Sequence, residues 1–143
     1  MPTAERLLER KGDHVASLDP DATVLDAAQL MNEAHIGSVL VTEGGRLAGI
    51  FTERDVLRRV VAVRRDPATV SLRDAMTTPV ACAAPHTTLD EIRRVMRAKR
   101  IRHMPVVDHD RILGVISIGD LNEAEITIQI ETISYLERYM SPT

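Results

Sequence analysis

The sequence GIFTERD at residues 49–55 returns in altered form as GVISIGD at residues 114–120, 65 positions further along the chain. The correspondence extends outward without a gap, so that residues 23–56 align with residues 88–121. Identical pairs in this window are Thr23 and Thr88, Met31 and Met96, Ile36 and Ile101, Arg46 and Arg111, Gly49 and Gly114, and Asp55 and Asp120. Because these identities fall at helix starts, turns and strand ends, we interpret the chain as two copies of one supersecondary unit.

Each copy carries the signals of a helix that leads into a hairpin. Thr23 and Thr88 precede apolar residues at helical spacing, with an acidic residue three positions later as in a capping box. Each predicted helix is followed by two short strands around a tight turn, and Thr52 and Ser117 then open further helices. The strands are expected at residues 38–41, 47–51, 104–107 and 112–116, with lead-in strands at 15–18 and 80–83.

These signals predict an α/β (α+β) fold of two pseudo-symmetric repeats, each ordered strand-helix-strand-strand-helix, with flanking helices at both ends. The predicted units are an N-terminal helix (1–14), a first repeat (15–65), a linker (66–79), a second repeat (80–124) and a C-terminal helix (125–143). Within them we expect helices over residues 3–11 and 121–140 and a helical turn at 72–76.

The composition excludes several classes of protein. The 143 residues include 44% apolar and 27% charged residues, which is the range of soluble globular chains. No apolar run is long enough to span a membrane, and the first residues lack the core of a signal peptide. A single cysteine, Cys82, fits a reducing compartment, so we expect a cytoplasmic protein in which this residue is buried in an apolar strand. The net charge of −3 and the near absence of aromatic residues argue against nucleic-acid binding.

The two copies resemble a pair of CBS motifs, the tandem also called a Bateman module. The motifs that carry the resemblance are IGSV at residues 36–39 and IRHMPVV at residues 101–107, each followed by the glycine-containing strand and aspartate quoted above. The resemblance covers about residues 15–124, and the flanking helices resemble those of the stand-alone bacterial form. It implies two intertwined halves with clefts that bind adenosine-containing ligands, and chains that pair into flat dimers.

The residue pattern alone leaves two interpretations open for Thr52 with Asp55 and for Ser117 with Asp120. A helix N-terminus favours anions such as phosphate, and an aspartate beside it can accept hydrogen bonds from the two hydroxyls of a ribose. The same pattern also forms an ordinary capping box with no ligand, as we expect for a third instance that begins at Ser71.

The resemblance favours the nucleotide interpretation and extends the predicted site. It implies that Arg102 and His103 contact nucleotide from the start of their strand. We expect the Ser117 and Asp120 site to be the tighter one, because its own copy supplies these two residues and residues 15–17 form the opposing wall. The full set of candidate nucleotide-binding residues is Lys11, Val15, Ala16, Ser17, Ile36, Gly37, Ser38, Thr52, Arg54, Asp55, Val80, Ala81, Cys82, Ile101, Arg102, His103, Ser117, Gly119 and Asp120.

Other constellations have weaker functional interpretations. The basic residues between Arg93 and Arg102 are typical of a solvated helix face. Asp108, His109 and Asp110 are typical of an exposed hairpin turn, so no metal site is expected. No phosphate loop of the Gly-x-x-x-x-Gly-Lys type and no set of catalytic side chains is recognisable.

We therefore expect a non-catalytic regulatory module that binds AMP, ADP, ATP or NAD and has no catalytic cofactor. Ligand binding between the halves would change their arrangement, and an effector protein that the sequence does not identify would respond to it. The alternatives are a ligand-free scaffold and, less favoured, a nucleic-acid-binding regulator. The apolar residues of the C-terminal helix predict a two-fold homodimer that uses this helix or the repeat helices.

Overall fold

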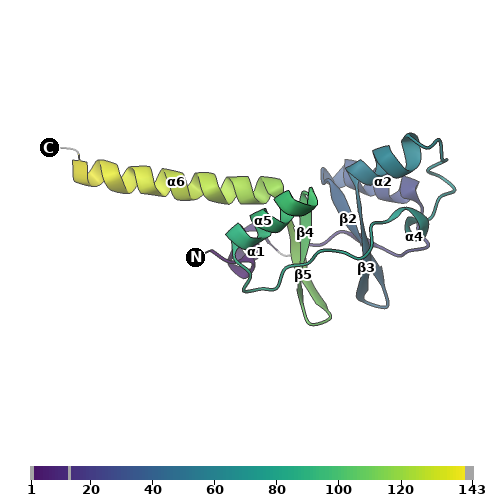
Figure 1. Cartoon of the computed structure of the whole chain (residues 1–143), viewed down its shortest axis with the longest axis horizontal. Helices are drawn as coiled ribbons and strands as arrows, with labels where there is room; N and C mark the ends of the chain where they lie inside the picture. Colours follow the sequence, from purple (N-terminus) through teal and green to yellow (C-terminus); the bar gives the residue numbers. More distant parts are fainter. Residues whose placement is uncertain (1, 13, 141–143) are drawn as a thin grey trace.

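The computed structural model describes residues 2–12 and 14–140 and shows the predicted mixed α+β fold. The first copy comprises β1 (Ser17–Leu18), α2 (Val24–Ala34), β2 (Ser38–Glu43), β3 (Arg46–Thr52), α3 (Glu53–Asp55) and the π-helix η1 (Val56–Val61). The second comprises α5 (Leu89–Lys99), β4 (His103–Asp108), β5 (Arg111–Ser117) and α6 (Ile118–Met140). α1 (Ala4–Lys11) precedes both copies and α4 (Leu72–Ala75) lies between them (Figure 1).

The two hairpins share one register, which confirms the repeat. β2 pairs antiparallel with β3 and β4 pairs antiparallel with β5, with Val39 opposite Phe51 and Met104 opposite Ile116. The register shifts at the same point in both, after Val41 and after Val106. Capping boxes at Thr23 and Thr88 begin α2 and α5 as predicted. By contrast, the Ser71 side chain makes no capping bond, so our expectation of a third capping box is wrong.

The second lead-in strand is a correction to the prediction. β1 pairs in parallel with β2, where the Leu40 amide donates to the Ala16 carbonyl at 2.9 Å. In the second copy this ladder shrinks to a single bridge between Ala83 and Val106. The residue equivalent to Leu40 is Pro105, which has no N–H to donate, and the ladder therefore loses a bond. Residues 80–82 consequently form a loop rather than a strand.

Each copy has its own apolar core, and the flanking segments intertwine the two. The first core includes Phe51, Val60 and Leu72, so α4 completes it. The second core includes Ile92 and Met104 together with Leu7 and Leu8 of α1. The helix that precedes the first copy thus packs on the second. Gly114 permits this close approach, because a Cβ atom there would lie 2.7 Å from Leu8 Cδ2.

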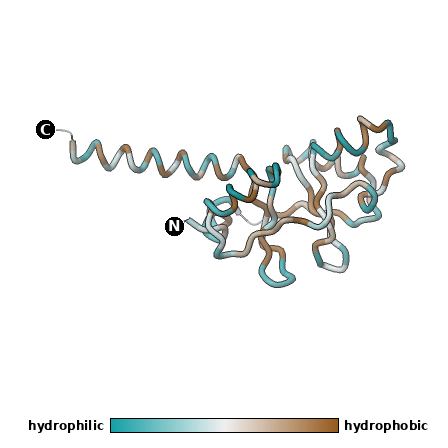
Figure 2. The backbone as a smooth tube through the Cα atoms, viewed as in Figure 1, coloured by the Kyte–Doolittle hydropathy of each residue, from teal (hydrophilic) through white to brown (hydrophobic). Residues whose placement is uncertain are grey.

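The C-terminal helix is longer than predicted at its start. α6 begins at Ile118 rather than at residue 121, because Ser117 caps it and β5 runs directly into it. Its first turns pack on the second copy, with Leu121 buried. The remainder projects well beyond the rest of the molecule (Figure 1), and apolar residues recur along it (Figure 2). No helix among the described residues is long and apolar enough to cross a membrane.

Candidate functional site

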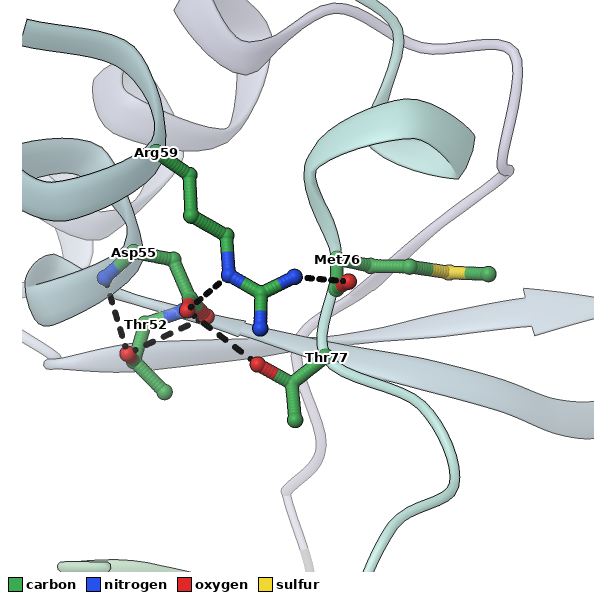
Figure 3. A network of polar contacts seen from close by, with 5 residues as sticks. All are labelled: Thr52, Asp55, Arg59, Met76 and Thr77. Carbon is green, nitrogen blue, oxygen red and sulfur yellow. Dashed lines mark hydrogen bonds and ion pairs between the residues drawn. The ribbon is translucent and has the colours of Figure 1, made fainter. Parts of the chain in front are cut away.

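Thr52 and Asp55 form a reciprocal capping box at the start of α3. The Thr52 amide donates to Asp55 Oδ2 at 3.0 Å, and the Asp55 amide donates to Thr52 Oγ1 at 3.3 Å. The other carboxylate oxygen, Oδ1, accepts from Thr77 Oγ1 at 3.1 Å and lies 3.3 Å from Arg59 Nε. Figure 3 shows these contacts around the carboxylate, whose residue is only 8% exposed. Both oxygens of Asp55 are therefore engaged within the chain.

Arg59 is held in turn by the segment that follows α4. Its Nη1 donates to the Met76 carbonyl at 2.9 Å, so one guanidinium joins η1, α3 and the linker (Figure 3). The sequence analysis missed both Arg59 and Thr77. Arg59 lies four residues after Asp55, and this spacing could have predicted the ion pair, because side chains four residues apart meet on a helix. Thr77 carried no comparable signal, since the linker lies outside the repeat.

Ser117 and Asp120 form the equivalent reciprocal pair at the start of α6. The Ser117 amide donates to Asp120 Oδ2 at 2.8 Å, and the Asp120 amide donates to Ser117 Oγ at 3.1 Å. Lys11 Nζ donates to the same Oδ2 at 2.7 Å and to the Val115 carbonyl at 2.6 Å. No hydrogen bond reaches Oδ1 from residues 2–12 or 14–140. The second aspartate thus keeps one carboxylate oxygen for a further donor.

The environment of Asp120 favours its charged form. Burial raises the pKa of the carboxyl group, but the hydrogen bonds from Lys11 and Ser117 outweigh burial and hold the pKa below its ordinary value. The side chain of Asp120 is 18% exposed to solvent, whereas the side chain of Asp55 is 11% exposed. Asp120 is therefore a carboxylate at neutral pH that solvent can still reach.

His103 lies where the two copies meet. A Cβ atom added to Gly37 would lie 3.0 Å from His103 Nε2 and 3.4 Å from Glu53 Oε1, so the ring stands against the first copy. Burial lowers the pKa of His103, and the charge of Glu53 only partly opposes this effect. The imidazole is accordingly neutral at pH 7, with one donor and one acceptor nitrogen. Glu53 is a further residue of this junction that sequence reasoning missed.

Backbone and guanidinium contacts fix the same junction. The Ile118 amide donates to the Arg102 carbonyl at 2.8 Å, and the Glu53 amide donates to the Gly37 carbonyl at 3.1 Å. Arg54 Nη1 donates to the Arg100 carbonyl at 2.7 Å and so ties the first copy to the end of α5. Both strand starts, at Gly37 and Arg102, are thereby bonded to the helix start of their own copy.

The remaining predicted site residues fall into three places. Ile36, Ser38 and Ile101 lie at the same strand starts as Gly37 and Arg102, and Ser38 is buried while Arg102 and Gly119 are exposed. Val15, Ala16 and Ser17 lead into β1 at the edge of the first sheet. Val80 and Cys82 line a cavity of about 330 Å³ near the hairpin turns, with Arg46 and Asp110, and Ala81 packs against the second core.

Cys82 does not have the predicted environment. It is exposed, because residues 80–82 form a loop rather than the apolar strand in which a cysteine is buried. Partial desolvation raises the pKa of its thiol, which leaves it protonated at neutral pH. Within residues 2–12 and 14–140, no group of three His, Cys, Asp or Glu side chains is arranged to hold a metal ion.

Comparison with known proteins identifies the family. Residues 11–62 and residues 72–126 each match the model of the CBS domain. The chain belongs to the CBS domain family. A CBS domain-containing protein of Bacillus subtilis, YhcV, is 34% identical over 107 residues, which cover 75% of this chain and 76% of the relative. A mitochondrial CBS domain-containing protein of Arabidopsis thaliana, CBSX3, is 33% identical over 125 residues, which cover 84% of this chain and 61% of the relative.

Solved structures of CBS proteins have the same fold. A CBS-domain containing protein from Agrobacterium tumefaciens superimposes with a TM-score of 0.81 and 36% identity, over 86% of this chain and 98% of that one. A hexameric CBS-CP12 protein from bloom-forming cyanobacteria superimposes with a TM-score of 0.76 and 26% identity, over 97% of this chain and 88% of that one. The predicted tandem of CBS motifs is thus confirmed.

Proposed function

We propose that this chain is a regulatory module that binds an adenosine-containing nucleotide (AMP, ADP, ATP or NAD) beside Ser117 and Asp120. Tandem CBS domains are generally regulatory and typically non-catalytic, and the relatives reported above have no enzymatic name. The choice of adenine follows from the family resemblance. The choice of the second cleft over the first follows from the geometry of the two aspartates.

The observation that carries the proposal is the free oxygen of Asp120. Oδ2 is used by Ser117 and Lys11, whereas Oδ1 has no donor among the described residues. A ribose offers two adjacent hydroxyls, and a charged carboxylate is the acceptor that binds them most strongly. In the first cleft the same interaction would require Asp55 to release Thr77 or Arg59. The second cleft therefore needs the smaller rearrangement.

The start of α6 supplies what a phosphate requires. α6 runs from Ile118 to Met140, and the dipole of such a helix favours an anion at its N-terminus, although the Ile118 and Asp120 amides already donate to Arg102 and Ser117. Lys11 adds a cation at that end, 2.7 Å from Asp120. Arg102, exposed on the adjoining strand start, adds a second. The ribose acceptor and the phosphate donors are thus adjacent, as a nucleotide demands.

The junction between the copies suits a base. His103 is neutral, so its ring offers a flat surface and one hydrogen bond without repelling an uncharged purine. Gly37 lets this ring lie against the backbone of the first copy, because a Cβ atom there would be 3.0 Å from His103 Nε2. Ile36 and Ile101, both half-buried, supply aliphatic contacts at the two strand starts.

The proposal is tested with a nucleotide panel. We expect AMP, ADP, ATP or NAD to raise the melting temperature and to bind in calorimetry, whereas GMP and GTP bind more weakly. The nucleotide should be recovered unchanged, since the module has no catalytic role. Absence of binding by every adenine nucleotide at millimolar concentration would favour the ligand-free scaffold, and steady turnover by a pure sample would contradict the non-catalytic role.

A further inference from the structure

A groove of about 910 Å³ lies between α1 and α6 and adjoins the proposed nucleotide site, because Lys11 and Asp120 are among the residues that line it. α1 lies beside the first turns of α6 (Figure 1). Asp120 is the first residue of α6 that lines the groove and Glu131 is the last, which at the rise of an α-helix is a length of about 16 Å. A single phosphate beside Lys11 would therefore leave most of the groove unfilled.

The two walls of the groove carry opposite charges. Arg6 and Arg10 line it on α1, and Glu123 and Glu131 line it on α6. All four side chains are exposed, and none of them forms an ion pair within residues 2–12 and 14–140. Opposite charges that line one groove without pairing leave space between them for a ligand. Such a ligand would carry both an anionic and a cationic group.

The floor of the groove is apolar. It is formed by Leu7 of α1, Leu89 of α5, and Ala124 and Ile128 of α6. Leu7 is buried, Leu89 and Ala124 are half-buried, and Ile128 is 46% exposed. Apolar surfaces of this kind bind the flat rings of ligands, whereas a phosphate has no partner on them. The groove therefore suits a second ring better than a longer chain of phosphates.

We propose that the ligand of the second cleft is an adenine dinucleotide with a cationic second base, NAD⁺, whose second half lies in this groove. This inference rests on the proposed function, which places the adenosine ribose beside Asp120. The pyrophosphate then lies beside Lys11 and Arg10, and the pyridinium ring lies on the apolar floor beside Glu123 and Glu131. AMP does not reach the groove, and the additional phosphates of ATP would approach the two glutamates.

Calorimetry with a series of nucleotides at low ionic strength tests this inference. NAD⁺ should bind at least about tenfold more tightly than AMP, and more tightly than ATP. It should also bind about threefold more tightly than NADH, whose reduced ring carries no positive charge. NAD⁺ that binds no more tightly than AMP, ATP or NADH would overturn the inference and leave the proposed function intact. Absence of binding by both AMP and NAD⁺ would refute the two together.

Substitutions on the α1 wall test where the pyrophosphate lies. Arg6→Gln with Arg10→Gln should weaken NAD⁺ by roughly tenfold, the effect of losing charge-assisted hydrogen bonds, and AMP by less than about threefold. The matched control is Arg94→Gln with Arg97→Gln, which removes two exposed cations from α5 outside the groove. It should weaken neither ligand by more than about threefold. Equal weakening of NAD⁺ by both double variants would overturn the inference.

Substitutions on the α6 wall test where the pyridinium ring lies. Glu123→Gln with Glu131→Gln should abolish the preference for NAD⁺ over NADH, since both carboxylates next to the charged ring are then lost. Glu137→Gln removes an exposed carboxylate of α6 outside the groove and should leave the preference unchanged. All of these side chains are exposed, so the variants should fold. A preference that survives the loss of Glu123 and Glu131 would contradict this placement of the ring.

Discussion

Lys11 Nζ lies 2.7 Å from Asp120 Oδ2, so the N-terminal helix supplies the cation for the aspartate of the second CBS motif. In the first motif, Asp55 is paired instead with Arg59 of its own helical segment, 3.3 Å away. Arg59 and Thr77 together occupy the oxygen that Asp120 keeps open. The two copies therefore differ in the surroundings of this shared aspartate, and this difference is the reason that we propose the second cleft for the nucleotide.

Replacing Lys11 should raise the pKa of Asp120. In Lys11→Met the burial of the carboxyl remains, while the largest opposing contribution, the hydrogen bond from Lys11, is lost. A carbon-detected NMR titration of the Asp120 carboxyl should show its midpoint moving upward. Arg10→Met removes a cation from the same helix without touching Asp120 and should leave the midpoint in place. No upward shift in Lys11→Met would contradict the contact.

The same pair predicts an acid limit to stability. The pKa of Asp120 is lower in the folded chain than its ordinary value of 3.8, so the unfolded chain binds the proton more readily. The stability contributed by Asp120 is therefore complete above the ordinary pKa and is lost as pH falls through the folded value. Urea unfolding at pH 3 and pH 6 should show a smaller loss in Lys11→Met than in the wild type. An identical loss in both would argue against the ion pair.

Asp55 should be far more important for folding than an ordinary capping residue. Asp55→Ala removes the cap and the charged bonds to Thr77 and Arg59, so we expect a loss of about 2–4 kcal/mol in the free energy of unfolding. Asp26 makes the same capping box at the start of α2, but in an exposed position and without further partners among the described residues. Asp26→Ala should cost about 1 kcal/mol in the same urea titration. Equal losses would show that the Arg59 network contributes nothing.

His103 should titrate below its ordinary pKa of 6.5, because burial disfavours the imidazolium. The imidazole of the unfolded chain therefore binds a proton at a higher pH than that of the folded chain. Stability should begin to fall as pH drops through 6.5 and should continue to fall until the pH is below the pKa of His103 in the folded chain. The charge of Glu53 opposes this shift, and Glu53→Gln should lower the pKa of His103 further. Proton NMR of the imidazole gives both midpoints. A midpoint at or above 6.5 in the wild type would place His103 outside the junction.

The sequence predicted the parts of this fold that depend on local spacing. The repeat offset placed both hairpins, and the Thr and Glu or Asp spacing placed the helix starts at Thr23 and Thr88. What it did not predict depends on single side chains or distant contacts. Pro105 cannot donate to a lead-in strand, so that strand is reduced and Cys82 is exposed. The pairing of Lys11 with Asp120 depends on how α1 packs against the second copy, which no local pattern encodes, whereas the pairing of Arg59 with Asp55 follows a helical spacing that the sequence does contain.

Calorimetric titration of AMP and ATP into three proteins shows which of the two clefts binds the nucleotide. The proteins are the wild type, Asp120→Asn and Asp55→Asn, each first shown to be folded at the temperature used. We expect Asp120→Asn to weaken binding by roughly tenfold to a hundredfold, the effect of losing a charge-assisted hydrogen bond, and Asp55→Asn to change affinity by less than about threefold. Binding that survives in Asp120→Asn and is lost in Asp55→Asn would contradict the assignment of the nucleotide to the second cleft.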